Sequence, residues 1–155
     1  MKKYEFTGET KVIAGVTLKR IRALISFGFI VKGEIGGFIE SEKNLSHDGN
    51  AWVSGNARVT DNARVTDNAR VTDNAEVTGN ADCMLIGRIG SRSDFTTFFK
   101  DKDGGISVKC GCFSGTIEEF REKVEETHGT NTKHAKVYQA AANLAEMQIL
   151  DQEAA

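Results

Sequence analysis

The chain has 155 residues, of which 39% are hydrophobic and 27% are charged, and its formal net charge is -2. These values are typical of globular domains and give no basic surface for a nucleic-acid polymer. No segment approaches the ~20 apolar residues of a membrane span, and residues 1–11 lack the apolar core of a secretory signal. We therefore expect a cytoplasmic protein that binds neither a membrane nor a nucleic-acid polymer.

The first 32 residues are predicted to form a β-structured N-terminal cap. Residues 4–6 and 16–24 have the composition of strands, and the second segment alternates polar and apolar residues over part of its length. Gly8, Gly15 and Gly28 mark breaks between extended segments.

Five near-identical six-residue units then follow one another. They occupy residues 53–58, 59–64, 65–70, 71–76 and 77–82. In each unit Ala-x-Val places two apolar side chains on one face of a short strand, and Thr-Asp-Asn or Ser/Thr-Gly-Asn supplies a turn. A helix needs apolar spacing near 3.6 residues, so the six-residue period favours strands.

This pattern, with an aliphatic residue first and a small residue fifth, resembles the hexapeptide repeat of left-handed parallel β-helices. The resemblance implies a mainly β fold with some α structure, in which residues 33–86 form a short left-handed parallel β-helix of about three coils. Three hexads would make one coil, so residue i would lie beside residue i+18 at ~4.8 Å. Arg58 would then stack on Glu76, and Trp52 and Phe38 would point outward, toward a cap or another subunit.

Residues 87–155 are predicted to form a β-hairpin followed by two helices. Segments 96–100 and 106–110 flank the glycine-containing loop 101–105. Thr116 and Glu119 have the spacing of a capping box that starts the first helix, and a second helix runs from Asn131 or Thr132 to about residue 150. The second helix is apolar on more than one face, which favours a subunit interface. The alternative is a monomer in which both faces pack on the hairpin.

A polar cluster begins where the repeat ends. Gly87 and Gly90 can let backbone amides approach a ligand, while arginines and hydroxyls suit a phosphate. The predicted ligand-binding residues are Arg88, Ser91, Arg92, Thr96, Thr97 and His128. The alternatives are a solvated connector and, for His128, a helix C-terminal cap.

Three cysteines, Cys83, Cys110 and Cys112, are expected to be reduced, because an odd number in a cytoplasmic chain does not indicate a disulfide framework. Cys110 and Cys112 share a face if they lie in a strand, and together with His128 or Cys83 they imitate zinc ligands. Structural zinc sites use wider spacing, so buried thiols are the favoured interpretation. We expect no metal, no cofactor and no catalytic residue.

Two further stretches carry a second resemblance. Gly36-Gly-Phe-Ile-Glu-Ser-Glu-Lys-Asn-Leu-Ser46, leading into Asn50-Ala-Trp-Val53, and Cys110-Gly-Cys-Phe-Ser-Gly-Thr-Ile-Glu-Glu-Phe120 resemble parts of small phage- and prophage-encoded hexapeptide-repeat proteins. This resemblance implies the cytoplasm of an infected or lysogenic bacterium. It implies no particular activity. Left-handed hexapeptide β-helices commonly form trimers, so the resemblance of the repeat implies a homo-oligomer, with a trimer favoured.

Three functions are compatible with these features. The first is a non-enzymatic phage protein that sequesters a nucleotide-like small molecule of host antiviral signalling. The second is an inhibitor or scaffold that binds a host or phage protein. The third is a hexapeptide-repeat acyltransferase, for which His47 is the available histidine in the early repeat; about three coils is short for the groove of such enzymes.

Overall fold

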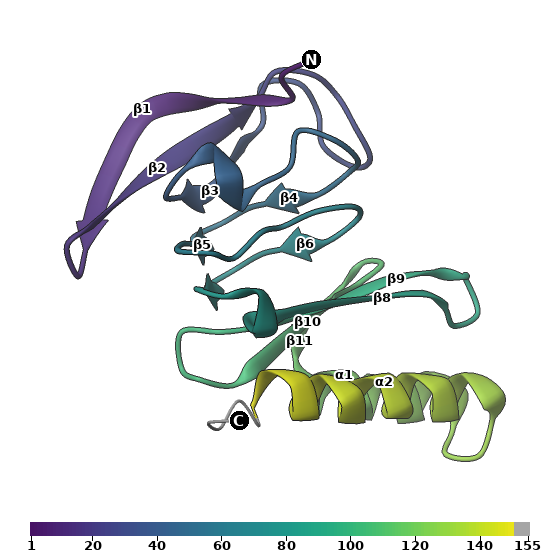
Figure 1. The fold of residues 1–155 in the computed structure, drawn as a ribbon. Coiled ribbons are helices and arrows are strands. Elements are labelled where there is room, and N and C mark those ends of the chain that lie inside the picture. The colour runs from purple at the N-terminus through teal and green to yellow at the C-terminus, as the bar shows by residue number, and fades with distance from the viewer. Residues whose placement is uncertain (151–155) are drawn as a thin grey trace. The chain divides into compact units, whose positions relative to one another are not determined.

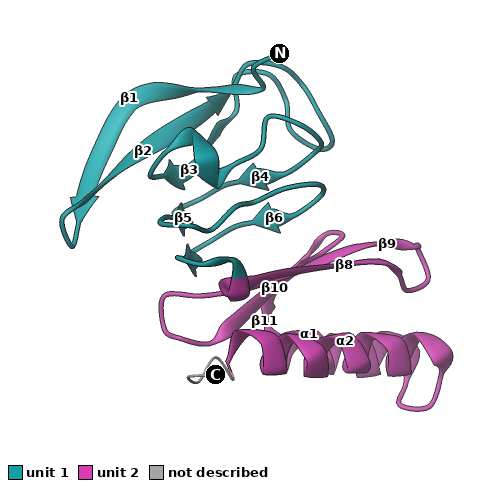
Figure 2. Cartoon of the chain, in the orientation of Figure 1, with its two compact units in different colours: residues 1–80 teal, residues 81–155 magenta. Residues whose placement is uncertain are grey.

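The computed structural model describes residues 1–150, which form a mixed α/β structure (Figure 1). Over these residues it has 11 strands in three separate sheets and two α-helices. The chain divides into two compact units, Met1–Asn80 and a second unit that begins at Ala81 (Figure 2).

The N-terminal unit is organised by a five-stranded mixed sheet with the order β1-β2-β3-β5-β7. Strands β1 (Tyr4–Ile13) and β2 (Val16–Ala23) form a long antiparallel hairpin, and β3 (Ile35–Ile39) pairs antiparallel with β2. The two strands predicted in the first 32 residues are confirmed. The first is longer than expected because cross-strand pairing continues to Ile13 despite a register shift between Phe6 and Thr10.

The repeats contribute four strands of two residues each: β4 (Trp52–Val53), β5 (Arg58–Val59), β6 (Arg70–Val71) and β7 (Glu76–Val77). They pair in parallel, Trp52 with Arg70 and Arg58 with Glu76. The predicted step of eighteen residues (52 to 70, 58 to 76) is therefore confirmed for these pairs. The predicted ion pair between Arg58 and Glu76 is present.

The predicted left-handed parallel β-helix is nevertheless wrong. Strands β5 and β7 extend the antiparallel β1-β2-β3 sheet, β4 and β6 form a separate two-stranded sheet, and the remaining hexad at residues 65–70 opens with only one isolated bridge, between Leu45 and Val65. The predicted classification of the chain as a hexapeptide-repeat β-helix protein is therefore also wrong. The physical reason is that each hexad supplies only two paired residues, so the sheets are dominated by the longer flanking hairpins.

The interior of the repeat region, defined as residues 51–82, is made of small side chains. Its valines and its alanines up to Ala75 are at most 4% exposed. The third position of the first four hexads turns the chain, and Gly55, Asp61, Asp67 and Asp73 have φ between 53° and 64°. A Cβ atom at Gly49 would lie 2.6 Å from the carbonyl oxygen of Asp67, eighteen residues further on (49 to 67). Glycine is therefore required at position 49.

The C-terminal unit is a four-stranded antiparallel sheet with two helices, in the strand order β11-β10-β9-β8. The strands are β8 (Cys83–Ile89), β9 (Asp94–Lys100), β10 (Ile106–Cys110) and β11 (Phe113–Thr116), and the helices are α1 (Ile117–His128) and α2 (Lys133–Ile149). Its core contains Phe98 and Val108 from the sheet, Phe120 from α1, and Ala142 and Ala145 from α2. Both helices therefore share one core with the sheet (Figure 1).

The main elements predicted for this unit are confirmed. The hairpin of β9 and β10 encloses residues 101–105, and Thr116 and Glu119 form the expected capping box at the start of α1. Thr132 caps α2 by accepting a hydrogen bond from the Ala135 amide. Strands β8 and β11 were not predicted. Across residues 1–150, neither helix is long and apolar enough to cross a membrane.

Candidate functional site

The candidate site is a cavity of about 200 Å³ within the C-terminal unit. It is lined by side chains from the turn after β8, the turn between β10 and β11, and both helices. The lining residues are Ser91, Arg92, Asp94, Cys110, Gly111, Cys112, Phe113, Phe120, Lys123, Val124, Thr127, His128 and Tyr138. The cavity therefore combines basic, hydroxyl, thiol and aromatic groups.

One wall of the cavity is aromatic. The Tyr138 ring lies edge-on to Phe120 with 5.7 Å between centroids, and the imidazole of His128 stacks on Tyr138 at 5.8 Å with an interplanar angle of 26°. Phe113 lies 5.7 Å from Phe120. Aromatic faces of this kind can pack against a planar heterocycle, which gives the site an apolar wall beside its polar groups.

Tyr138 is held in place by its close packing. A Cβ atom at Gly90 would lie 1.7 Å from the Tyr138 hydroxyl oxygen, so only glycine fits where the β8–β9 turn meets the ring. Burial, followed by the neighbouring Cys110, raises the pKa of Tyr138 to about 12. Its hydroxyl therefore remains a proton donor at neutral pH. Gly90, predicted to open the backbone to a ligand, instead accommodates this tyrosine.

Positive charge at the cavity comes from Arg92 and Lys123, and His128 adds an imidazole. Within residues 1–150, Arg92 makes no ion pair and no side-chain hydrogen bond, and its residue is exposed. Lys123 has only an exposed contact, 3.8 Å from Glu126. The one carboxylate that lines the cavity, Asp94, accepts a hydrogen bond from the Phe95 amide at 2.7 Å. The guanidinium is therefore available to an anionic ligand.

The cavity brings together three of the six predicted ligand-binding residues, namely Ser91, Arg92 and His128. Arg88 lies outside it, with its guanidinium carbon 5.3 Å from the Phe95 ring centroid and Nη1 3.5 Å from the Ser93 carbonyl oxygen.

Thr96 and Thr97 are also not cavity residues. They are 1% and 2% exposed in the middle of β9, and the Thr96 hydroxyl donates to the Cys110 sulfur at 3.2 Å. A strand with neighbours on both sides buries these hydroxyls, which is the physical reason that the sequence cluster does not form one surface.

Several cavity residues were not predicted from the sequence. Lys123 and Thr127 lie four residues apart on α1, so they share a helix face with one another, and His128 follows directly. That spacing is the only feature of the local sequence that could have predicted these residues as members of one site. Tyr138 and Phe113 reach the cavity through the packing of α2 and of the β10–β11 turn, which no local pattern reveals.

The prediction that the cysteines are buried thiols is wrong for Cys112. It is exposed, whereas Cys83 and Cys110 are of intermediate exposure, and all three are free. Among residues 1–150, no group of three or more His, Cys, Asp or Glu side chains is arranged to hold a metal ion.

A second hollow, of about 340 Å³, lies in the N-terminal unit beside β1, β2 and the repeat region. Its lining includes Ile13, Leu18, Arg58 and Glu76, and the last two neutralise one another as an ion pair. Because this arginine is already paired, the hollow is a weaker candidate for binding an anion than the cavity around Arg92.

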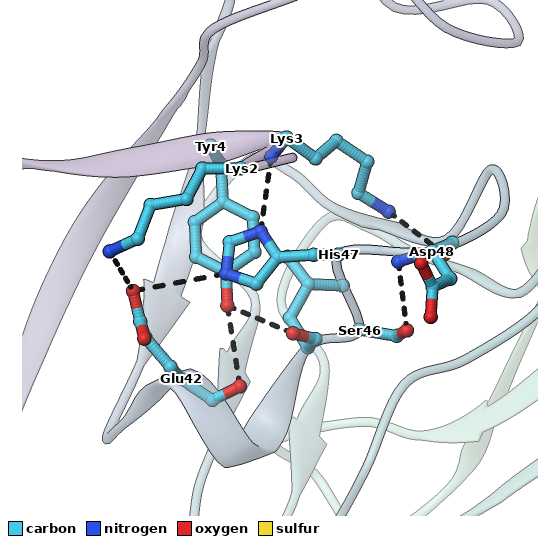
Figure 3. A network of polar contacts seen from close by, with 8 residues as sticks. Lys2, Lys3, Tyr4, Glu42, Ser46, His47 and Asp48 are labelled. Atoms are coloured by element: carbon cyan, nitrogen blue, oxygen red, sulfur yellow. Dashed lines mark hydrogen bonds and ion pairs between the residues drawn. The ribbon is translucent and has the colours of Figure 1, made fainter.

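His47, the histidine considered for acyl transfer, belongs to a polar network that anchors the N-terminus (Figure 3). Its Nδ1 accepts the Lys3 amide at 3.1 Å, its ring stacks on Tyr4 at 4.2 Å, and its Nε2 lies 3.8 Å from Glu42. The Tyr4 hydroxyl donates to the carbonyl oxygen of Leu45 at 2.8 Å. These contacts give His47 a structural role.

Comparison of the chain with protein-family models and with curated protein sequences finds no match. The resemblance to phage-encoded proteins therefore stays a prediction, and the function has to be argued from the site.

Proposed function

We propose that the C-terminal unit binds a small nucleotide-like anion in the cavity around Arg92, without catalysing a reaction. The observation that carries the proposal is the Arg92 guanidinium, which has no ion-pair partner among the described residues and lines a cavity with an aromatic wall. Arginine offers forked donors that match a phosphate or carboxylate. Lys123 adds positive charge at the same cavity, and His128 adds an imidazole.

The size of the cavity narrows the ligand class. Pockets for drug-sized ligands are typically ~300–1,000 Å³, and this cavity measures about 200 Å³. It suits one phosphate group with part of a single heterocycle. We therefore favour a mononucleotide or the terminal part of a larger nucleotide, whose remainder would stay outside the cavity.

The biological setting belongs to the same proposal. The protein would act in the cytoplasm of an infected or lysogenic bacterium, where sequestering a nucleotide-like signal would blunt an antiviral response. The resemblance of residues 36–53 and 110–120 to small phage proteins supports this setting.

Isothermal titration calorimetry of the full chain tests the binding step. The titrants are inorganic phosphate, AMP, ADP-ribose and a cyclic dinucleotide. We expect measurable heat with at least one nucleotide, and Arg92→Gln should weaken that binding by about ten- to a hundredfold, the range of a lost charged hydrogen bond.

Arg88→Gln is the matched control, because Arg88 is also an exposed arginine, at the end of β8 before the turn that carries Arg92, but does not line the cavity. It should change the affinity by less than about threefold, a change of well under 1.4 kcal/mol. Absence of heat with every titrant would reject the proposal, and so would an equal loss in the two variants.

A second candidate function, binding to another protein chain, is favoured by the outer surface of α2. Leu144, Met147 and Leu150 are 49%, 64% and 47% exposed, which is unusual for three large apolar residues so close together. A homo-oligomer would cover this surface. Native mass spectrometry of the purified chain counts its subunits, and a strictly monomeric protein would count against self-association.

A further inference from the structure

The turn between β10 and β11 carries two thiols on either side of one glycine. Cys110 pairs with Phe113 across the hairpin, so Gly111 and Cys112 form a two-residue turn. Gly111 has φ 58°, the left-handed conformation that glycine adopts without strain. The sequence Cys110-Gly111-Cys112 is thus bent back on itself.

This bend keeps the two cysteines within bonding reach. Residues two apart span at most about 7 Å between Cα atoms even when fully extended, and a turn shortens that span. Disulfides form across Cα separations of ~4.4–6.8 Å. Both cysteines line the same cavity.

The surroundings favour reaction at this pair. Cys112 is exposed, and Cys110 is partly exposed, with its sulfur accepting a hydrogen bond from the Thr96 hydroxyl at 3.2 Å. A Cβ atom at Gly111 would lie 3.4 Å from Arg92 Nη1, which places a guanidinium beside the turn. An anionic oxidant such as glutathione disulfide would meet positive charge at the exposed thiol.

Cys83 provides an internal contrast within the same unit. Burial, with a smaller contribution from the Asp82 carboxylate, raises the pKa of the Cys83 thiol to about 12. The thiolate is the reactive form of cysteine, so we expect Cys83 to react slowly at neutral pH.

We propose that Cys110 and Cys112 form a reversible dithiol–disulfide pair in the wall of the cavity, oxidised by low-molecular-weight disulfides. The Cys112 thiolate attacks one sulfur of glutathione disulfide, forms a mixed disulfide and releases one glutathione thiolate. The Cys110 sulfur, after losing its proton, attacks the Cys112 sulfur and releases the second glutathione. The pair loses two electrons and two protons, and glutathione disulfide becomes two glutathione thiols. This inference does not depend on the identity of the ligand proposed for the cavity.

The test is a redox titration of the full, folded chain. The reduced protein is equilibrated under argon with mixtures of reduced and oxidised glutathione, quenched with acid, alkylated and analysed by mass spectrometry. We expect a species lighter by two hydrogens, whose disulfide lies within one peptide that contains Cys110 and Cys112. Cys83 should be alkylated only after denaturation.

Two variants separate the steps. Cys110→Ser should stop the reaction at a glutathione adduct on Cys112, and Cys112→Ser should lose the internal disulfide and react at least tenfold more slowly. Phenylarsine oxide, which bridges two neighbouring thiols, should protect both cysteines of the wild-type chain from alkylation and should not protect the remaining cysteine of either variant. Circular dichroism checks that each variant is folded.

The proposal would be overturned if the wild-type chain accumulated only glutathione adducts or formed only disulfides between chains. It would also be overturned if the chain remained fully reduced in glutathione disulfide. A disulfide that involves Cys83 instead of Cys112 would do the same.

Discussion

The repeat region and the C-terminal unit bury their apolar side chains in different ways. In the repeat region the interior is built from valine and alanine at fixed intervals, each between 0% and 4% exposed in residues 51–77. In the C-terminal unit the core gathers Phe98, Phe120 and Tyr138, whose rings meet edge to face. The first interior distributes its buried area over many equivalent small residues, and the second concentrates it in a few large ones.

This difference predicts how each region responds to substitution. Buried apolar area stabilises a fold by about 25 cal/mol per Å², so a single aromatic residue contributes more than a single valine. Loss of one ring should therefore be severe in the C-terminal unit. Loss of one repeated side chain should be milder in the repeat region.

The largest effect is expected for Phe120→Ala. Phe120 is 4% exposed and its ring lies 5.7 Å from each of Phe98, Phe113 and Tyr138. Its removal should lower the free energy of unfolding by about 3–5 kcal/mol, the usual cost of an aromatic-to-alanine cavity. Urea denaturation followed by circular dichroism measures it. A loss below about 1 kcal/mol would show that the ring cluster is not the main source of stability.

A smaller effect is expected for Val71→Ala in the repeat region. Val71 is fully buried and pairs with Val53, and the substitution removes two methyl groups' worth of buried surface. The expected loss is about 2 kcal/mol. Val31→Ala is the matched control, because Val31 is 65% exposed, and it should cost less than about 0.5 kcal/mol. If Val71→Ala were as harmful as Phe120→Ala, the contrast between the two interiors would be wrong.

The smallest effect concerns Lys3, a buried charged residue in the interior of the N-terminal unit. Lys3 is 1% exposed, and its ammonium donates to the Ala51 carbonyl oxygen at 2.8 Å. Burial, opposed by the Asp48 carboxylate, lowers the pKa of Lys3 from 10.5 to about 8. Between these two values the unfolded chain binds more protons than the folded chain, so stability should rise with pH.

Comparison of wild type with Lys3→Met isolates this contribution. From pH 7.5 to pH 9.5 the wild type should gain about 1–2 kcal/mol relative to the variant in urea denaturation, because each pKa unit is worth about 1.4 kcal/mol. Other groups that titrate in this range are common to both proteins and cancel in the difference. Lys2→Met is the control, since the Lys2 side chain is 67% exposed. A constant or falling difference would show that the folded protein holds Lys3 charged throughout.

Much of the local structure could be predicted because its signals lie in short segments. The capping box of Thr116 and Glu119 defined the start of α1, and the loop at residues 101–105 defined the β9–β10 hairpin. The eighteen-residue step between Arg58 and Glu76 followed from the six-residue period. The prediction of a β-helix was wrong, because the flanking hairpins decide which sheet each two-residue strand of the repeat joins.

The candidate site was less predictable. Ser91 and Arg92 lie together in one turn, so sequence proximity found them. Thr96, only four residues beyond Arg92, is lost from the site because β9 is covered on both sides and buries it. Lys123, Tyr138 and Cys112 join the cavity through helix and hairpin packing. Such contacts are set by the tertiary structure, which the spacing of residues along the chain does not encode.

The turns of the repeat region limit how far identical hexads can be multiplied. The backbone of Asp67 lies beside Gly49 and the backbone of Asp73 lies beside Gly55, so at both turns an aspartate faces a glycine eighteen residues earlier in the chain. Adding further Val-Thr-Asp-Asn-Ala-Arg copies would seat aspartate against aspartate, and at a site like Gly49 would also force a Cβ atom onto a carbonyl oxygen. Identical hexads could therefore not be placed eighteen residues apart at the Gly49 turn without a shift of the backbone.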